Sequence, residues 1–360
     1  MTKIIDMKKV FVYANYSDEI LNPDSKFMAI GGAEVQLAFW SKALGEVAKV
    51  YSFSYAFSRF FRKRREWGIR FCFVPFIRKV NALLFYIKPL WLVFIRPDYL
   101  VMKAVTQEIG FILKLKKRLG FKLVYFMASD NDVEEDGTMR KKRMFTAIKN
   151  ADYVVAQNEF QEIKVKEVLG AKNVIQLGNI WDKSVFRDAS NNKQYDYVWV
   201  AKFNENKRPE WFVDLARRNP NLKFAMVGPC KSKKKYTHLL EEIEGLQNLN
   251  YLGFKFLIDA TEIVSQSRCL VCTSIYEGFP NTFLQAFSYS IPVLSTVNPS
   301  NIILKYHLGC VYETLEEAIE FIRDDGPSKV NPKAIQCYFE ENHNPVTLRN
   351  KLANFIQMEI

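Results

Sequence analysis

Apolar and polar positions alternate along the chain in short blocks that predict strands and helices in turn. In the first half, a helix is predicted at 31–46, directly after paired glycines, and strands are predicted at 8–16, 49–54, 70–77, 98–105, 122–129, 151–157 and 173–180. Basic amphipathic stretches lie between several of these strands. Alternation of this kind, with short connections, is typical of parallel sheets that carry helices on both faces.

The periodicity fades and the composition turns polar over residues 183–192, which suits a linker. Beyond it a second series begins, with strands predicted at 195–203, 222–228, 249–254, 269–274 and 291–297 and helices at 208–218, 261–267, 281–290, 315–325 and 346–357. A chain of 360 residues is long enough for two cores. We therefore predict an α/β protein with two doubly wound domains, 1–182 and 193–360.

The net charge of +12 is distributed unevenly. Residues 57–122 alone contain 16 basic and 3 acidic residues, whereas residues 181–360 contain 21 of each. Phe, Trp and Tyr are interleaved with the basic residues over 58–96, so one interpretation of 58–122 is a face that binds an anionic membrane. A solvated face over an aromatic core is an alternative. Nucleic-acid binding is another, but no recognised module accompanies the charge, and we expect no nucleic-acid partner.

Targeting and membrane-spanning signals are weak in this sequence. The first sixteen residues contain no apolar core of a secretory signal. The longest nearly apolar run, 80–95, is interrupted by Lys88-Pro89 and is short for a span of about 20 residues. Six scattered cysteines include one CxxC pair, Cys269 and Cys272, but a zinc site would need a second close pair. We expect a cytoplasmic protein with reduced core cysteines.

The strongest candidate site is the segment 272–296. A strand is predicted to end at Ser274, a glycine-bearing turn follows, and Pro280-Asn281 opens a helix. Open α/β sheets bind ligands at such strand ends, and the N–H groups of a helix N-terminus favour phosphate. Glu277, in the turn, could accept hydrogen bonds from sugar hydroxyls, and Gln285 follows about two helical turns later. On spacing alone, a packed turn with an exposed Glu explains the segment equally well.

The residues of this segment carry a family resemblance. E-G-F-P-N-T-F-L-Q-A-F, followed by I-P-V-L-S-T, resembles the signature of glycosyltransferase family 4, the group 1 family of retaining enzymes. The segments 200–216, 225–230, 30–44 and 151–180 resemble further parts of that family. The resemblance implies the GT-B fold, in which two Rossmann-like domains face each other across a cleft and the C-terminal helix returns to the N-terminal domain.

The resemblance also implies roles for individual residues. Glu277 would contact the donor sugar, and Lys202 and Lys207 would bind the donor diphosphate, with Lys202 in place of the commoner Arg. Gln285 replaces a ribose-binding Glu, so it keeps hydrogen-bonding capacity but loses the charge. The remaining expected donor-binding residues are Gly31, Gly32, Gly228, Gly278, Phe279, Pro280, Asn281 and Thr282.

Asp130 is the best candidate for orienting a sugar from the N-terminal domain. The family often has a His or Asp near the reacting carbon, but His238, His307 and His343 all lie in the second half. An acidic solvated loop explains Asp130 equally well. Asp130-Asn131-Asp132 also spells a DxD, which binds a metal in glycosyltransferases of another fold. That fold has a single Rossmann-like domain, so we expect no metal and no cofactor.

The function that the resemblance implies is retaining transfer of a sugar from a nucleotide-sugar donor to a glycan or lipid-linked acceptor, as in polysaccharide or glycolipid synthesis. In the mechanism proposed for such enzymes, the leaving phosphate helps to remove the acceptor proton, so a strong protein base is unnecessary. Two alternatives stay open. One is a non-catalytic or weakly active nucleotide-sugar-binding protein, motivated by Gln285 and the missing histidine. The other is a nucleotide-sugar epimerase of the same fold.

Overall fold

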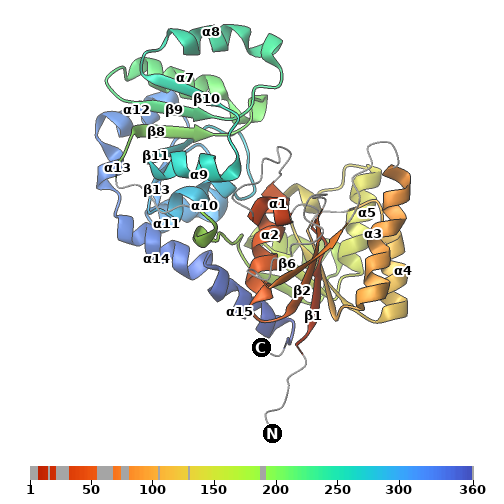
Figure 1. The fold of residues 1–360 in the computed structure, drawn as a ribbon. Coiled ribbons are helices and arrows are strands. Elements are labelled where there is room, and N and C mark those ends of the chain that lie inside the picture. Colours follow the sequence, from red (N-terminus) through yellow and green to blue (C-terminus); the bar gives the residue numbers. More distant parts are fainter. Residues whose placement is uncertain are drawn as a thin grey trace. The chain divides into compact units, whose positions relative to one another are not determined.

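The fold comes from a computed structural model that describes residues 7–14, 17–21, 32–54, 68–73, 81–103, 106–128, 130–186 and 192–358. The chain divides into two compact units. Unit 1 comprises Met1–Ile180 and Asn344–Ile360, and unit 2 comprises Trp181–His343. Residues 187–191 of the expected linker lie outside the described residues. Figure 1 shows a parallel sheet with helices on both faces in each unit.

Unit 1 is built on a seven-stranded parallel sheet in the order β3-β2-β1-β4-β5-β6-β7. The strands are β1 (Lys9–Val12), β2 (Lys49–Ser54), β3 (Ile69–Phe73), β4 (Tyr99–Lys103), β5 (Lys122–Phe126), β6 (Tyr153–Ala156) and β7 (Val174–Gln176). The helices are α1 (Ser17–Leu21), α2 (Gly32–Gly45), α3 (Asn81–Ile95), α4 (Ile109–Leu119), α5 (Met139–Lys149) and α6 (Glu159–Leu169). All seven strands predicted in this half are present.

Unit 2 is built on a six-stranded parallel sheet in the order β10-β9-β8-β11-β12-β13. The strands are β8 (Tyr195–Val200), β9 (Phe224–Val227), β10 (Leu249–Gly253), β11 (Ser267–Cys272), β12 (Val293–Ser295) and β13 (Gly309–Val311). The helices are α7 (Pro209–Arg218), α8 (Thr237–Gly245), α9 (Leu257–Ser265), α10 (Asn281–Phe287), α11 (Ile302–Lys305), α12 (Leu315–Arg323), α13 (Gly326–Lys329) and α14 (Pro332–Asn342). Strand β13 was not predicted.

The burial of the central strands agrees with the parallel arrangement of both sheets. All five residues of β4 and all four of β9 are buried, as expected for strands covered by helices on both faces. In each sheet the strand order reverses beside the first strand, between β1 and β4 in unit 1 and between β8 and β11 in unit 2. The carboxyl ends of the strands at such a reversal are the usual ligand site of this fold class.

The last helix, α15 (Pro345–Phe355), belongs to unit 1, where it packs against α2. The Arg349 guanidinium pairs with the Glu46 carboxylate, and the Tyr99 hydroxyl donates to the carbonyl oxygen of Ile356 (3.1 Å). The chain thus returns to its first unit at its end, as expected.

Helix α3 covers residues 81–95 of the apolar run noted in the sequence, with Pro89 inside it. No helix among the described residues is both long enough and apolar enough to span a membrane.

Candidate functional site

Two loops meet at the carboxyl edge of the unit 2 sheet. One follows β8 and leads through a single 3₁₀ turn, Glu205–Lys207, into α7. The other follows β11 and leads through residues 273–280 into α10. Because β8 and β11 are paired neighbours at the reversal of strand order, loops that lie some 70 residues apart in sequence become adjacent.

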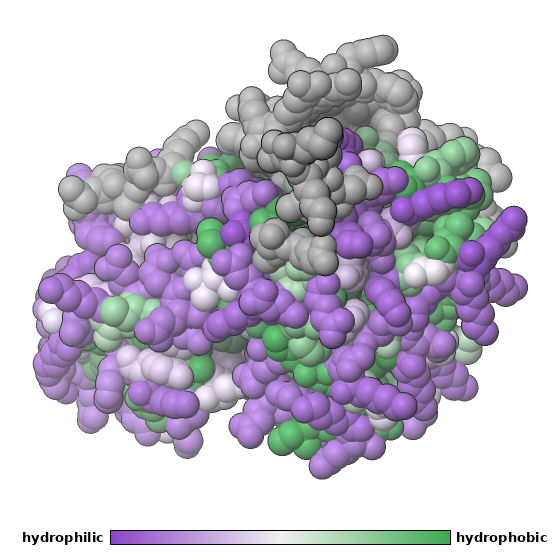
Figure 2. Space-filling model, turned by 90° about the horizontal axis from the view of Figure 1, so that it is seen from below, coloured by the Kyte–Doolittle hydropathy of each residue, from purple (hydrophilic) through white to green (hydrophobic). Residues whose placement is uncertain are grey.

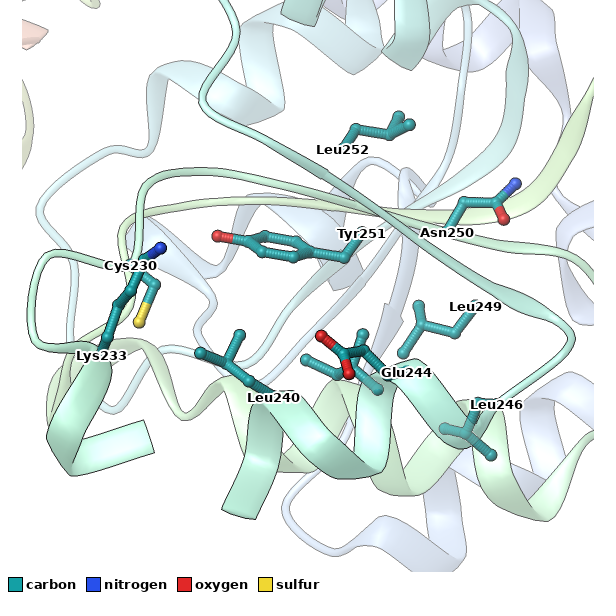
Figure 3. Close-up of a pocket in the computed structure, with 10 residues that line it drawn as sticks. Cys230, Lys233, Leu240, Glu244, Leu246, Leu249, Asn250, Tyr251 and Leu252 are labelled. Carbon is teal, nitrogen blue, oxygen red and sulfur yellow. The ribbon is translucent and has the colours of Figure 1, made fainter. Parts of the chain in front are cut away.

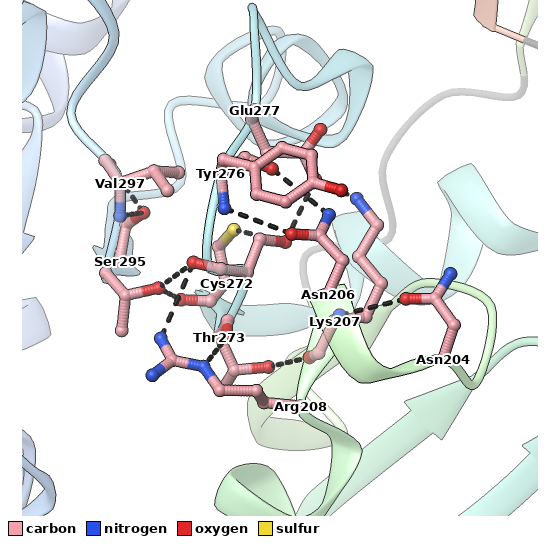
Figure 4. A network of polar contacts seen from close by, with 12 residues as sticks. Asn204, Asn206, Lys207, Arg208, Cys272, Thr273, Tyr276, Glu277, Ser295 and Val297 are labelled. Atoms are coloured by element: carbon pink, nitrogen blue, oxygen red, sulfur yellow. Dashed lines mark hydrogen bonds and ion pairs between the residues drawn. The ribbon is translucent and has the colours of Figure 1, made fainter.

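Asn206 joins the two loops through three hydrogen bonds. Its carbonyl oxygen accepts from the Ile275 amide (2.7 Å), its Oδ1 accepts from the Tyr276 amide (3.1 Å), and its Nδ2 donates to the Tyr276 carbonyl oxygen (3.1 Å). These three hydrogen bonds resemble those between two paired strands. They fix the position of residues 275–276 relative to the turn after β8 (Figure 4).

Arg208 adds a second connection. It occupies the left-handed region (φ 40°), and its Nε donates to the Thr273 carbonyl oxygen (2.7 Å). The guanidinium lies over the Trp211 ring, 3.8 Å from its centre, in a cation–π contact. The Thr273 hydroxyl in turn donates to the Lys207 carbonyl oxygen and accepts from Trp199 Nε1 (3.0 Å). Asn206 and Arg208 were not among the predicted site residues, because only their contacts in space reveal them.

Glu277 and Lys207 form an ion pair between the two loops. The Ser274 hydroxyl also donates to Glu277 Oε1 (2.9 Å), so the carboxylate is held from two sides. Their side chains are 19% and 24% exposed, which leaves both groups within reach of a ligand. Burial lowers the pKa of Lys207 from its ordinary value, and the Lys202 ammonium lowers it further. The neighbouring Cys272 acts in the opposite direction and raises the pKa of Lys207.

Lys202 and Gly228 lie at the ends of β8 and β9. Lys202 is exposed and makes no hydrogen bond or ion pair with a described residue. Gly228 has φ 147°, and a Cβ there would lie 1.6 Å from the Ala201 carbonyl oxygen. Only glycine therefore fits, and its first role is to let the two strand ends pack backbone against backbone.

The predicted residues 278–282 form the turn into α10, which begins at Asn281. Gly278, Asn281 and Thr282 are half-buried, and Pro280 is buried. The Phe279 ring packs against His343 (5.0 Å between ring centres) and Phe283 (6.4 Å). Phe279 is therefore partly a packing residue of unit 2.

Gln285 lies on the buried side of α10, with 3% exposure. Its Nε2 donates to the Thr261 hydroxyl of α9 (3.0 Å), while its Oε1 is buried and has no hydrogen-bond partner in the described structure. A buried acceptor without a donor is unfavourable by about 1–3 kcal/mol. This amide oxygen is thus the unsatisfied polar group of the segment.

The predicted residues of unit 1 are only partly described. Gly31 lies outside the described residues, and Gly32 is the first residue of α2. Asp130 opens a 3₁₀ turn, Asp130–Val133, but its side chain lies outside the described part of the chain.

A buried polar group at the carboxyl edge of the unit 1 sheet was not predicted. Lys103, the last residue of β4, donates to Asn179 Oδ1 (3.2 Å), which also accepts from Gln157 Nε2 (3.0 Å). Burial lowers the pKa of Lys103 to about 7, against an opposing effect of the Asp132 carboxylate. The only sequence signal was a lysine inside an apolar strand.

A cavity of about 500 Å³ opens elsewhere in unit 2, between α8 and the edge strand β10. Half of its ten lining residues are Leu or Ile, and Cys230 and Lys233 lie at one end (Figure 3). None of the predicted site residues lines it. The Tyr251 hydroxyl donates to the Gly228 carbonyl oxygen (3.0 Å), so the cavity lies next to the end of β9. Neither Lys207 nor Glu277 lines it.

Comparisons with known proteins find glycosyltransferases among the relatives of this chain. Residues 182–305 match the family model described as glycosyl transferases group 1. An uncharacterized glycosyltransferase of Methanocaldococcus jannaschii is 28% identical over 171 residues, which cover 41% of this chain and 40% of that protein. Glycosyltransferase 1 domain-containing protein 1 of Xenopus tropicalis is 26% identical over 133 residues, 34% of this chain and 38% of that protein. The alignments thus span about two-fifths of each curated relative.

The fold is similar to that of Anabaena HepE, solved in complex with UDP. The TM-score is 0.72 at 14% identity, and the alignment covers 98% of this chain and 100% of that one. Identity this low is evidence of fold alone, and it confirms the predicted fold class of two Rossmann-like domains, as in GT-B glycosyltransferases. Within that fold, the residues that match the family model of group 1 glycosyl transferases, 182–305, contain the Lys207–Glu277 pair.

Proposed function

We propose that this chain is a glycosyltransferase that moves a sugar from a nucleotide-sugar donor to a glycan or lipid-linked acceptor with retention of configuration. The observation that carries the proposal is the Lys207–Glu277 pair, held between two loops at the carboxyl ends of β8 and β11. A cation and a carboxylate with fixed partners suit a ligand that carries both a diphosphate and hydroxyl groups.

The two lysines supply the charge that departure of a diphosphate requires. Lys207 is anchored by its contact with Glu277, and Lys202 is exposed on the same loop. Both ammonium groups would stabilise negative charge as the bond from the sugar to the phosphate breaks. Glu277 would then accept hydrogen bonds from sugar hydroxyls and so fix the position of the reacting carbon.

Gln285 is proposed to contact the nucleotide ribose. Its unpaired Oε1 is a buried acceptor, and a ribose hydroxyl would satisfy that oxygen once the bound donor opens access to it. Its amide nitrogen would keep the contact with Thr261. This neutral contact is weaker than one with a carboxylate, so donor affinity is expected to depend more on the lysines.

Release of nucleoside diphosphate from a donor without acceptor tests the proposal. HepE has been solved with UDP and glucose, so UDP-glucose is the first donor to try, followed by other common nucleotide sugars, with EDTA present because we propose that no metal is needed. Glu277→Gln and Lys207→Met are each expected to lower the rate about 100-fold while the fold is kept. Glu205→Gln is the matched control, because Glu205 lies on the same turn but is 82% exposed and pairs with Lys235.

The alternatives give different results in the same assay. A nucleotide-sugar-binding protein without activity would be stabilised by UDP but would release none from any donor, and the transfer proposal would then fail. An epimerase would convert the donor into an isomeric nucleotide sugar. Equal rates for wild type and Glu277→Gln would remove Glu277 from the proposed site.

We also propose that the acceptor is met at the cytoplasmic face of a membrane, through the basic aromatic segment 58–122. Residues 55–67 and 74–80 lie outside the described residues, so the support comes from the exposed side chains of α3 and α4. A polybasic surface of this kind is attracted to anionic lipids of the cytoplasmic leaflet.

A further inference from the structure

Helix α8 covers the edge of the unit 2 sheet incompletely. It packs beside β10, the edge strand of the described sheet, which pairs with β9. Of the nine residues of α8, all of which the structure describes, Ile243 alone is buried. The cavity of about 500 Å³ lies between this helix and this strand (Figure 3). Its volume falls within the range of about 300–1,000 Å³ that is usual for small-molecule sites, so the cavity is large enough to hold a ligand.

Leucine side chains line this cavity. Leu240 of α8, Leu246 directly after that helix and Leu252 of β10 are each half-buried, so part of their apolar surface stays in contact with water. On the face drawn in Figure 2, hydrophilic residues prevail and the described apolar ones form separate patches. Three leucines that open into one cavity differ from such scattered surface residues. Apolar surface gathered in a concave place is typical of a ligand site.

A positive charge lies at one end of the cavity. Lys233 lines that end together with Cys230, while Glu244 lies farther along α8 (Figure 3). Lys233 and its neighbour Lys234 are exposed and form no ion pair with a described residue. An anionic group of a ligand can therefore approach the Lys233 ammonium without displacing a carboxylate of the protein.

We propose that this cavity binds a small amphiphilic anion, an aliphatic chain that ends in a carboxylate or a phosphate. The chain packs against Leu240, Leu246 and Leu252, and the anionic group contacts Lys233. The Glu244 carboxylate repels an anion at its own position, so it determines which end of the ligand meets the lysine. A neutral apolar molecule would leave the lysine without a partner, and a free phosphate would leave the leucines in water. None of the residues proposed to bind the sugar donor lines the cavity, so the inference does not rest on the proposed function.

Isothermal titration calorimetry with short amphiphiles tests the proposal. Octanoate and octyl phosphate are both expected to bind, and the tighter of the two identifies the preferred anionic group. 1-Octanol lacks the charge and inorganic phosphate lacks the chain, so each should bind at least about fivefold more weakly than the tighter probe. The proposal would be overturned if neither octanoate nor octyl phosphate bound, or if 1-octanol bound as tightly as the better of them.

Substitutions examine the two parts of the cavity separately. Lys233→Met should lower the affinity for the charged amphiphiles at least about fivefold and leave that for 1-octanol unchanged. Lys234→Met is the matched control, because Lys234 lies on the same turn but does not line the cavity. Leu246→Asn should weaken binding of all three chains at least about fivefold, whereas Leu304→Asn, at a 54% exposed position of α11, should weaken none. Equal losses in the two lysine variants would indicate adsorption to surface charge and would contradict the proposal.

Alkylation of Cys230 tests the location without any substitution. Cys230 lines the cavity and is half-buried, whereas Cys337 is exposed on α14. Saturating octanoate should slow the reaction of iodoacetamide with Cys230 and leave that with Cys337 unchanged, as measured by peptide mass spectrometry. If octanoate slowed neither thiol, or slowed both equally, the ligand would lie elsewhere and the proposal would fail.

Competition with UDP separates the cavity from the proposed donor site. UDP should leave the affinity for octanoate unchanged, because Lys202, Lys207 and Glu277 do not line the cavity. Displacement of octanoate by UDP would make the cavity part of the donor site and would overturn the inference. A protein that binds octanoate at Cys230 but hydrolyses no donor would support the inference while the glycosyl-transfer proposal fails. Donor hydrolysis by a protein that binds neither amphiphile would do the reverse.

Discussion

At the scale of single residues, Lys103 shows how burial changes a common side chain. It is 7% exposed at the end of β4, and its hydrogen-bond partner Asn179 is neutral, so the ammonium is poorly compensated. The pKa falls to about 7 in the folded chain from an ordinary value of 10.5. Between these two values the unfolded chain binds more protons than the folded one. The free energy of unfolding should therefore rise with pH across that window.

Lys103→Met is expected to flatten this dependence. For the wild type, denaturant unfolding at about pH 7 and about pH 9 should show stability rising by up to about 1.4 kcal/mol per pH unit from this group. The methionine variant lacks the titration and should be the more stable protein at neutral pH. Lys172→Met, at an exposed position, is the control and should keep the wild-type slope. Identical slopes in all three proteins would show that Lys103 is solvated.

The same scale shows which site residues a sequence can indicate. Glu277, Lys202 and Lys207 could be predicted because they belong to a pattern of fixed order around a strand end. The position of Gln285 could be predicted too, but not its partner, since Thr261 lies on a different helix. Asn206 offered no signal, because its role is set by hydrogen bonds to residues 275–276.

At the scale of elements, buried strands were the most predictable features. Strand β9 is a continuous apolar run and β4 is apolar up to Lys103, and their short length helps to distinguish them from helices. Strand β13 is only three residues long and half-buried, so it left no run to detect. Helix α3 contains Pro89, which normally indicates a helix boundary, so the helix could not be inferred from the pattern of 80–95.

The two loops of the candidate site act as one element, and Arg208 tests this. Arg208→Gly should remove the bond to the Thr273 carbonyl while relieving the left-handed backbone (φ 40°). Stability should change by no more than about 1 kcal/mol, because the two effects oppose each other. The rate of donor hydrolysis should fall at least about tenfold, because the loop that carries Glu277 loses one of its connections to the turn after β8.

Steady-state kinetics together with denaturant unfolding measure both effects of Arg208→Gly. Gln357→Gly is the matched control, since Gln357 is exposed, also left-handed (φ 55°), and belongs to unit 1. It should gain stability without any change in rate. If Arg208→Gly kept the wild-type rate, the contacts between the two loops would be structural only.

At the scale of the whole molecule, the return of α15 determines which core the C-terminus stabilises. Leu352 is fully buried on α15, in the unit that contains α2. Leu352→Ala should therefore destabilise unit 1 by about 2–5 kcal/mol, the usual cost of a cavity left by a buried leucine. The last helix follows unit 2 in sequence, so the pattern of elements alone would predict that Leu352→Ala destabilises unit 2 rather than unit 1.

Hydrogen exchange followed by mass spectrometry can show which unit loses stability in Leu352→Ala. Peptides from α2 and β1 should lose protection in Leu352→Ala, while peptides from β8 and β9 keep theirs, because exchange reports the stability of each unit separately. Val346→Ala, at a 48% exposed position on the same helix, should leave both units unchanged. Equal loss of protection in both units would mean that they unfold as a single cooperative body. Loss confined to β8 and β9 would place α15 with unit 2, against the contacts of Arg349 with Glu46 and of Tyr99 with Ile356.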